Sequence, residues 1–228
     1  MTLAPRRWLA TLAVLAGLSP FLAVLARELQ ISQREWRAAQ HNAAIAQRAR
    51  ELFQQGARAE AIAAIEARLR EDPDDADLRS LLGALRLREN DLTGARRELE
   101  HVLARHPSHV GAYNSLGLVA KREGRPEEAR RCWEEAIRLA PGATRAHENL
   151  GILELREGHW AAAVAQLQSA AQVDPASANV RARLGVALLK SGDVSQARSE
   201  LTRALAIDPE QPIARRNLAL LEERTVAP

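Results

Sequence analysis

The sequence predicts an all-α protein in which antiparallel helix hairpins stack into a superhelical solenoid. Three observations carry this prediction. Alanine, leucine, arginine and glutamate dominate the chain, and all four favour helices. A Leu-Gly pair recurs at a constant interval within apolar stretches, and a proline recurs at the same interval. A fixed period of this length is typical of helical repeat architectures.

The repeat is defined by glycines that follow one another at intervals of 34 residues, namely Gly83, Gly117, Gly151 and Gly185. Four further columns share this period. A proline column consists of Pro73, Pro107, Pro141, Pro175 and Pro209, and a small-residue column of Ala61, Ala95, Ala129, Ala163 and Ala197. A large apolar column consists of Ile65, Leu99, Trp133, Leu167 and Leu201, and a loop column of Gly56, Asn90, Gly124, Gly158 and Gly192.

Each repeat is expected to contain two helices, as the copy at residues 110–143 shows. Gly124 is expected to end the first helix in a left-handed conformation. Pro126 suits the first turn of the second helix, and Pro141 stops that helix because it has no N–H group to donate. Glycine costs a helix about 1 kcal/mol relative to alanine. We therefore expect Gly117 to allow close packing against the small residues Ala129 and Ala136 of the second helix, with Trp133 filling the space beside them.

At these residues the sequence resembles the tetratricopeptide repeat family, whose pattern is W-x2-L-G-x2-Y, then A-x3-F-x2-A, then P. The copy at 110–143 matches it through Tyr113, Leu116, Gly117, Ala120, Ala129, Trp133, Ala136 and Pro141. Five copies are expected, at residues 42–75, 76–109, 110–143, 144–177 and 178–211. Residues 212–228 are expected to form a C-terminal capping helix and tail.

The first copy departs from the pattern. Arg48 and Ala49 replace its Leu-Gly pair, and Arg68 interrupts a column of small residues. The resemblance implies a general scaffold for protein–protein interaction, with partner segments bound in the concave groove that the first helices line. It does not imply a particular partner.

The N-terminal segment at residues 8–26 carries no charge and follows Arg6 and Arg7. As a helix it would be roughly 28 Å long, close to the thickness of a bilayer core. Residues 1–26 are therefore interpreted as a signal anchor with one transmembrane helix. A cleaved signal peptide ending near Ala26 and a buried soluble helix remain alternatives.

The basic N-terminus favours a cytoplasmic start, which would place the repeats in a bacterial periplasm, anchored in the inner membrane by a single pass. Residues 27–41 have no match to the repeat and are interpreted as a juxtamembrane helix. Residues 28–53 contain neither proline nor glycine and predict one long helix that leaves the membrane and enters the first repeat.

Several classes of function are disfavoured by the sequence. The charges balance over most of the chain, which argues against a nucleic-acid partner. Cys132 is the only cysteine, so no internal disulfide can form, and it is expected to be a semi-buried filler. His101, His106 and His109 meet no metal-ligand spacing and are interpreted as solvated loop residues. With no catalytic motif, we expect no enzyme activity, cofactor, metal or small-molecule substrate.

The expected partner-binding groove contains polar and cationic residues at first-helix positions, namely Asn114, Lys121, Arg145, Asn149, Arg183, Arg216 and Asn217. Together these residues suggest a preference for an acidic, extended segment of a partner protein. The alternative is that they are ordinary residues of the family. A second basic column, Arg88, Arg122, Arg156 and Lys190, has the further alternative that cations stabilise helix C-termini.

The leading functional hypothesis is a membrane-anchored scaffold that binds a partner protein during assembly or stabilisation of an envelope or membrane complex. One alternative is a permanent structural subunit of a larger membrane complex, in which Gly17 allows close packing of the anchor helix. A second alternative is a periplasmic repeat protein released by signal cleavage. An enzyme with an unrecognised site is the third.

Overall fold

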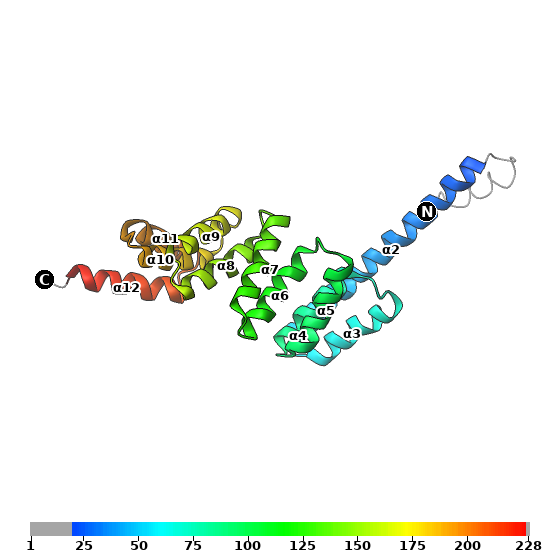
Figure 1. The fold of residues 1–228 in the computed structure, drawn as a ribbon, viewed down its shortest axis with the longest axis horizontal. Helices are drawn as coiled ribbons and strands as arrows, with labels where there is room; N and C mark the ends of the chain where they lie inside the picture. Colours follow the sequence, from blue (N-terminus) through cyan, green and yellow to red (C-terminus); the bar gives the residue numbers. More distant parts are fainter. Residues whose placement is uncertain (1–19, 227–228) are drawn as a thin grey trace. The chain divides into compact units, whose positions relative to one another are not determined.

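The computed structural model describes residues 20–226, which are helical apart from short turns. These residues belong to two compact units, one within residues 1–73 and the other within residues 74–228, and each unit is described by itself. The helices (Figure 1) are α2 (Pro20–Gln54), α3 (Arg58–Glu71), α4 (Ala76–Arg88), α5 (Leu92–Arg105), α6 (Val110–Arg122), α7 (Pro126–Leu139), α8 (Thr144–Glu157), α9 (Trp160–Val173), α10 (Ala178–Ser191), α11 (Val194–Ile207) and α12 (Pro212–Val226).

The second unit consists of four helix hairpins and a final single helix. The hairpins are α4–α5, α6–α7, α8–α9 and α10–α11, and each places one helix before and one after a short turn. The predicted left-handed turn residues are confirmed, with φ of 65° at Asn90, 74° at Gly124, 83° at Gly158 and 94° at Gly192. Asparagine is one of the few side chains that tolerate this conformation, which explains why it replaces glycine once.

Within each hairpin, the glycine of the first helix lies against the large apolar residue of the second. A Cβ atom on Gly117 would lie 2.4 Å from Nε1 of Trp133, whose side chain is fully buried. Gly83, Gly151 and Gly185 meet Leu99, Leu167 and Leu201 in the same way, at 2.6–2.7 Å from the leucine Cγ atoms. The expected close packing is therefore present, but its direct partner is the large side chain. Ala129 and Ala136 are fully buried beside it.

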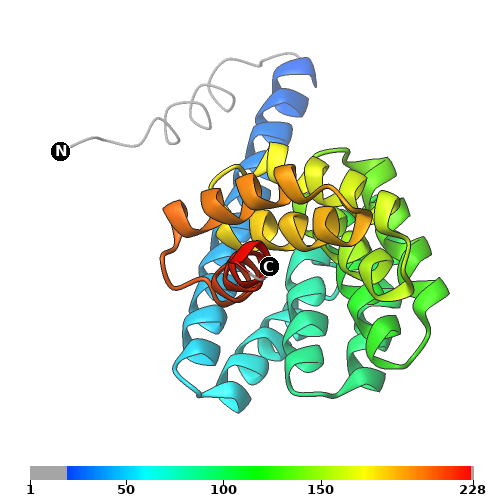
Figure 2. The same cartoon turned by 90° about the vertical axis from the view of Figure 1, so that its left-hand side faces the viewer.

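The hairpins of the second unit stack so that their first helices lie on the inner side of the curve. Each second helix packs on the first helix of the next repeat, as in the pairs α5–α6, α7–α8, α9–α10 and α11–α12. Consecutive first helices also contact one another, whereas no two second helices do so among the described residues. Figure 2 shows the stack from one end, with α12 seen nearly end-on.

The last helix covers the end of this stack. Ala214 and Leu221 of α12 are buried in one cluster with Leu201 and Ala204 of α11 and Ala182 of α10. The side-chain amide oxygen of Gln211 accepts a hydrogen bond from the Ala214 backbone N–H at 2.8 Å and so caps the helix N-terminus. The buried face of α12 thus completes the apolar core of the fourth hairpin.

The first unit is a hairpin of α2 and α3. Ala49, which stands in the glycine position, and Ile65 are both fully buried. Arg68 donates from Nε to the side-chain oxygen of buried Asn42 at 2.6 Å, so the arginine in the small-residue column is accommodated by a polar contact. The helix predicted at residues 28–53 lies inside α2, which begins at Pro20.

The interpretation of residues 1–26 as an anchor mostly concerns residues 1–19, which lie outside the described part of the chain. Among the helices that the structure describes, none combines the length and the apolar character needed to cross a bilayer. The anchor therefore stays a prediction.

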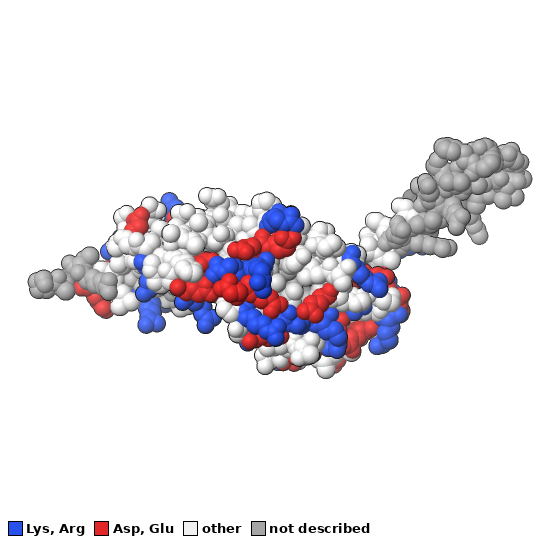
Figure 3. Space-filling view, in the orientation of Figure 1, with Lys and Arg blue, Asp and Glu red and all other residues white. Residues whose placement is uncertain are grey.

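Arginines of the second helices join consecutive repeats through ion pairs. Arg96 on α5 pairs with Glu123 at the end of α6 and with Glu128 on α7, at N···O distances of 2.5 and 2.6 Å. One repeat later, Arg130 on α7 pairs with Glu154 and Glu157 of α8. In Figure 3, blue and red side chains intermingle in a band over α6 and α7. The charges on this surface are thus largely compensated.

Hydrogen bonds from arginines lower the pKa values of two carboxylates, Glu128 and Glu98. A hydrogen bond from Arg96 holds the pKa of Glu128 below its usual value, although partial burial opposes the shift. Burial raises the pKa of Glu98, but hydrogen bonds from Arg97 and Arg79 outweigh burial and leave it lowered. Both groups therefore favour the ionised form in the folded chain.

The first prediction concerns the glycine that packs against Trp133. Replacing Gly117 with alanine places a Cβ atom against a buried ring that has no flexible end to move away. We expect a loss of about 1–3 kcal/mol in the free energy of unfolding, measured by urea denaturation. Gly142→Ala is the control, because no atom lies within 4 Å of the position that its Cβ would take. Equal stability of the two variants would contradict the packing argument.

The second prediction concerns pH. Because the folded-state pKa of Glu128 is lowered, its contribution to stability is complete above the unfolded pKa of about 4.3 and disappears as the pH falls through the folded value. Arg96→Gln should cost about 1–3 kcal/mol at neutral pH. The variant should also lose less stability than the unaltered chain between pH 7 and about pH 3. Parallel pH profiles from urea denaturation would show that Arg96 does not stabilise the ionised form of Glu128.

Candidate partner-binding surface

The inner sides of α6, α8, α10 and α12 carry the residues predicted to bind a partner, and this surface is called the first-helix face. Asn114 and Lys121 lie on α6, Arg145 and Asn149 on α8, Arg183 on α10, and Arg216 and Asn217 on α12. Because these four helices contact one another in succession, their equivalent positions form rows across the stack.

The asparagines do not form one uniform row. The side-chain amide of Asn149 donates to the side-chain oxygen of Asn114 at 3.0 Å, which links α8 to α6. Asn217 instead donates to the Ile213 carbonyl of its own helix at 2.8 Å. A ligand would therefore meet a linked pair of amides on α6 and α8 and a locally bonded amide on α12.

One of the first-helix positions that the sequence assigns to the groove holds a glutamate, Glu148, which lies among the cations of this face. Glu148 on α8 accepts a hydrogen bond from Asn179 at 2.9 Å and lies 3.3 Å from Nε of Arg183. Glu148 stands 34 residues after Asn114 and so occupies the same position of the repeat, which places it on the first-helix face. The charge of Arg183 is therefore partly compensated, whereas Arg145 and Arg216 are exposed.

Lys121 lies in the last turn of α6. Its side chain is partly buried, and burial lowers the pKa of its ammonium group. Arg156 on α8, Arg183 on α10 and Arg122 lower this pKa further through like-charge repulsion. The structure thus brings the predicted residues Lys121 and Arg183 into one electrostatic environment, and it adds Arg156 to them.

An apolar row runs beside these cations. Leu118, Ile152 and Val186 are half-buried, and Leu220 on α12 is 47% exposed. These residues occupy one position in three successive repeats and the final helix, and in the repeats they stand three or four residues before a basic residue of the helix end. The first-helix face therefore offers apolar and cationic contacts side by side.

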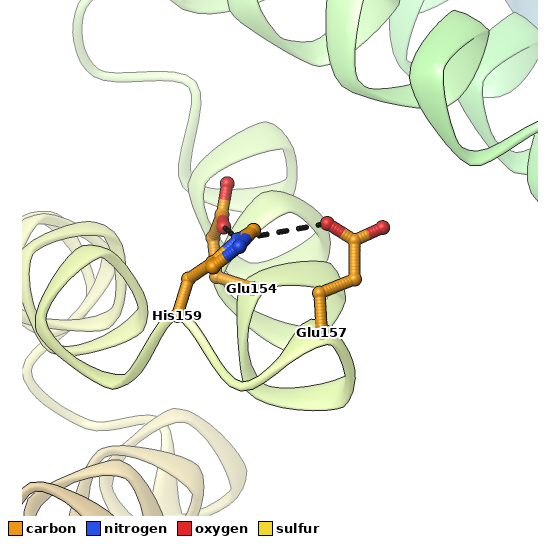
Figure 4. A group of neighbouring side chains, drawn as sticks. All are labelled: Glu154, Glu157 and His159. Carbon is orange, nitrogen blue, oxygen red and sulfur yellow. Dashed lines mark hydrogen bonds and ion pairs between the residues drawn. The ribbon is translucent and has the colours of Figure 1, made fainter.

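One cluster elsewhere has the composition of a metal site. Glu154, Glu157 and His159 offer ligand atoms that all lie within 4.8 Å of one another (Figure 4). However, Arg130 pairs with both carboxylates, and Nδ1 of His159 lies 2.8 Å from Glu154. The charges of both carboxylates are therefore compensated by Arg130, and the cluster forms an ion-pair network between α7 and α8.

The interpretation of three histidines as solvated loop residues is wrong for His101, which lies within α5 and has a buried Nε2 atom, whereas His106 is exposed at the end of α5. Nδ1 of His109 accepts a hydrogen bond from the Ala112 backbone N–H at 3.0 Å and caps α6, while its Nε2 lies 3.1 Å from Asp77. Cys132 is buried in the core between α5, α6 and α7, and burial raises the pKa of its thiol to about 11. The expected role of Cys132 as a buried filler is confirmed.

Comparison with known proteins identifies the family. A tetratricopeptide repeat model matches residues 52–121 and 154–221, and a second one matches residues 114–180. The chain belongs to the tetratricopeptide repeat family. A search of curated proteins finds no significant match.

Solved tetratricopeptide repeat structures share the fold at low sequence identity. A structure from a functional characterisation of Pseudomonas aeruginosa PilF has 23% identity and a TM-score of 0.67, covering 75% of this chain and 78% of that one. The thermophilic protein TTC0263 of Thermus thermophilus has 21% identity and a TM-score of 0.64, covering 78% and 97%. YrrB, described as having an unusual peptide-binding site, has 21% identity and a TM-score of 0.57, covering 75% and 88%.

The third prediction concerns the thiol of Cys132. With a pKa of about 11, only about one thiol in a thousand is ionised at pH 8, and the thiolate is the reactive form. We expect the folded chain to react with a thiol-specific reagent far more slowly than the same chain in denaturant. Absorbance of the released chromophore would measure both rates. Similar rates would show that Cys132 is accessible in the folded state.

Proposed function

We propose that this tetratricopeptide repeat protein is a membrane-anchored scaffold that binds a segment of a partner protein on its first-helix face. The observation that carries the proposal is that the exposed Arg145 and Arg216 share first helices that contact one another with a row of half-buried and exposed apolar residues, namely Leu118, Ile152, Val186 and Leu220. A tetratricopeptide repeat fold is a protein-interaction scaffold, and this is the part of its surface with the most varied chemistry.

The second helices are less suited to this role. Their arginines are engaged in ion pairs that hold repeats together, as Arg96 and Arg130 are. Occupying those residues with a ligand would break contacts on which the stack depends. On the first-helix face, Arg145 and Arg216 are exposed and can contact a partner without such a loss.

The proposed location is the inner membrane of a bacterium, with the repeats in the periplasm. Support comes from the uncharged residues 8–26 after a basic N-terminus. The proposed role is assembly or stabilisation of an envelope or membrane complex. A fold neighbour, PilW, is described as a type IV pilus biogenesis factor, which is compatible with this class of role.

The fourth prediction tests the face. The full-length protein would be solubilised in detergent from its native host, purified by affinity and analysed for partners by mass spectrometry. A variant with Arg145→Glu, Arg183→Glu and Arg216→Glu should lose its partners, because reversed charges repel an acidic segment. The N-terminal peptides of the same sample report whether the chain begins near Met1 or after Ala26.

The matched control reverses three exposed arginines of second helices, with Arg131→Glu, Arg138→Glu and Arg203→Glu. This control has the same net charge and should keep the partners. Circular dichroism would establish that both variants are folded. If partners persist with the first variant, or are lost equally with both variants, the binding surface does not lie on the first-helix face.

A further inference from the structure

We propose that the N-terminal part of α2 pairs in parallel with the same segment of a second copy of this chain, through a coiled-coil seam centred on Trp36. The partner in this contact is the chain itself, so the proposal goes beyond the binding of a segment of another protein. It concerns the first unit alone and does not depend on the first-helix face of the second unit.

Only the C-terminal part of α2 is covered by another helix. α2 has 35 residues and α3 has 14, and α3 is the one helix that contacts α2 among the described residues. Between residues 36 and 54, the buried residues are Asn42, Ala46 and Ala49. The N-terminal part of α2 extends past the end of α3 (Figure 1). Because helices in proteins are stabilised mainly by packing, this part would gain most from a partner helix.

The uncovered part of α2 carries an apolar side chain of unusual exposure. Trp36 is 61% exposed, the highest value among the large hydrophobic residues that the structure describes as exposed. Ser32, Ala39 and Ala43 are exposed on the same stripe of the helix. At 100° per residue, Trp36 lies about 120° around the helix from Asn42. The stripe is therefore separate from the face that packs on α3.

The stripe has the spacing of a coiled-coil seam, with intervals of three and four residues that add up to seven. The a positions of this heptad hold Leu22, Leu29, Trp36 and Ala43, and the d positions hold Leu25, Ser32 and Ala39. In a parallel pair, Trp36 would insert between Ser32 and Ala39 of the second copy. The small side chains of these two residues leave room for the indole ring.

The charges beside the seam favour a second copy in the parallel orientation. The sequence has Glu28 and Glu35 at g positions, and Gln33 and Gln40 at e positions. In a parallel pair each g position faces an e position of the other copy, so glutamates would meet amides that can donate hydrogen bonds. In an antiparallel pair, g positions face one another and the glutamates would repel. The basic residues stand at b and f positions, away from the seam, namely Arg27, Arg34, Arg37 and His41.

A membrane surface fits the exposed tryptophan less well than a second copy does. With the proposed anchor ending at Ala26, Trp36 follows ten residues later, which is about 15 Å along a helix. The headgroup region on each side of a bilayer is only about 5–8 Å thick, so Trp36 would lie beyond it. Two chains anchored in one membrane would also present their α2 helices in the same direction, as the seam requires.

Cysteine cross-linking tests both the contact and its direction. Full-length protein in detergent would carry Ser32→Cys or Ala39→Cys, at two exposed d positions, and would be oxidised with copper phenanthroline. Both variants should form disulfide-linked dimers on a non-reducing gel, because each d position faces its own copy in a parallel pair. Arg37→Cys and His41→Cys, at exposed positions away from the seam, are the matched controls and should not. The unaltered chain, whose Cys132 is buried, gives the background.

Each result of the cross-linking decides one part of the proposal. No dimer from either seam variant would overturn the contact. A dimer from only one of them would overturn the parallel direction, and equal dimer formation by the controls would overturn the register of the seam.

A second measurement separates the seam from other contacts between copies. Light scattering in detergent should give a protein mass of twice 25.0 kDa for the unaltered chain. Trp36→Gln should weaken the dimer at least about tenfold, because it removes the largest side chain of the seam. Leu220→Gln, at a site on α12 with 47% exposure, should leave the dimer intact. Circular dichroism would establish that both variants are folded, as expected for changes at exposed sites.

Other occupants of the stripe give different results. A dimer that Trp36→Gln does not weaken would place self-association in the anchor or on another surface and overturn the seam. A monomer whose tryptophan emission is quenched in nanodiscs of brominated lipid, with less quenching in Trp36→Gln, would assign Trp36 to the membrane surface. A monomer that loses a co-purifying protein on Trp36→Gln would assign the stripe to that protein. Either of these last two results would overturn the proposal.

The outcome can be distinguished from that of the proposed function. The variant with Arg145→Glu, Arg183→Glu and Arg216→Glu leaves α2 unaltered and should remain dimeric, whereas Trp36→Gln leaves the first-helix face unaltered. A monomeric chain that keeps its partners would preserve the scaffold and remove the dimer. A dimer whose partners do not depend on the three arginines would preserve the seam and remove the proposed binding face.

Discussion

The contact between a helix glycine and a large apolar residue sets the geometry of every hairpin in the second unit. Gly117 leaves room for Trp133, and leucines occupy the same space in the other three hairpins. The missing side chain lets the two helices approach closely enough to bury the large residue completely. Because all four hairpins use this contact, they have nearly the same shape and can stack on one another with similar interfaces.

Because the hairpins stack in the same way, residues at equivalent positions of successive repeats form rows on the surface. Residues that share a repeat position lie on consecutive first helices, and those helices contact one another along the inner side of the stack. Rows such as Leu118, Ile152 and Val186 follow from this arrangement. Residues that differ between repeats, such as Asn114 and Glu148, break the uniformity of a row.

Much of the fold could be predicted from the sequence, because the repeat fixes local structure. The loop residues Asn90 and Gly124 have the expected left-handed conformation, and the described part of the chain is helical as predicted. Contacts between helices were harder to predict. The sequence pointed to alanines opposite Gly117 rather than to Trp133 itself, because helical spacing identifies a face but not which side chain on the facing helix meets it.

At the candidate site, the partners of polar and charged residues could not be predicted from the sequence for the same reason. The spacing of Glu148 and Arg183 along the chain does not reveal that they form an ion pair, and the bond between Asn114 and Asn149 depends on how far one repeat is offset from the next. Likewise, the ion pairs of Arg96 with Glu123 and Glu128 join residues that are far apart in the sequence. Such contacts require the rotation between repeats, which no single helix pattern contains.

The distribution of compensated charge gives the two sides of the stack different roles. Arg96 and Arg130 each meet two carboxylates from the neighbouring repeat, so second-helix arginines are used to hold the repeats together. Lys121 has cations as its electrostatic neighbours instead. A chain with nearly equal numbers of acids and bases has ample carboxylates to compensate this lysine as well. Its electrostatic neighbours therefore set Lys121 apart from Arg96 and Arg130, whose partners are carboxylates of the neighbouring repeat.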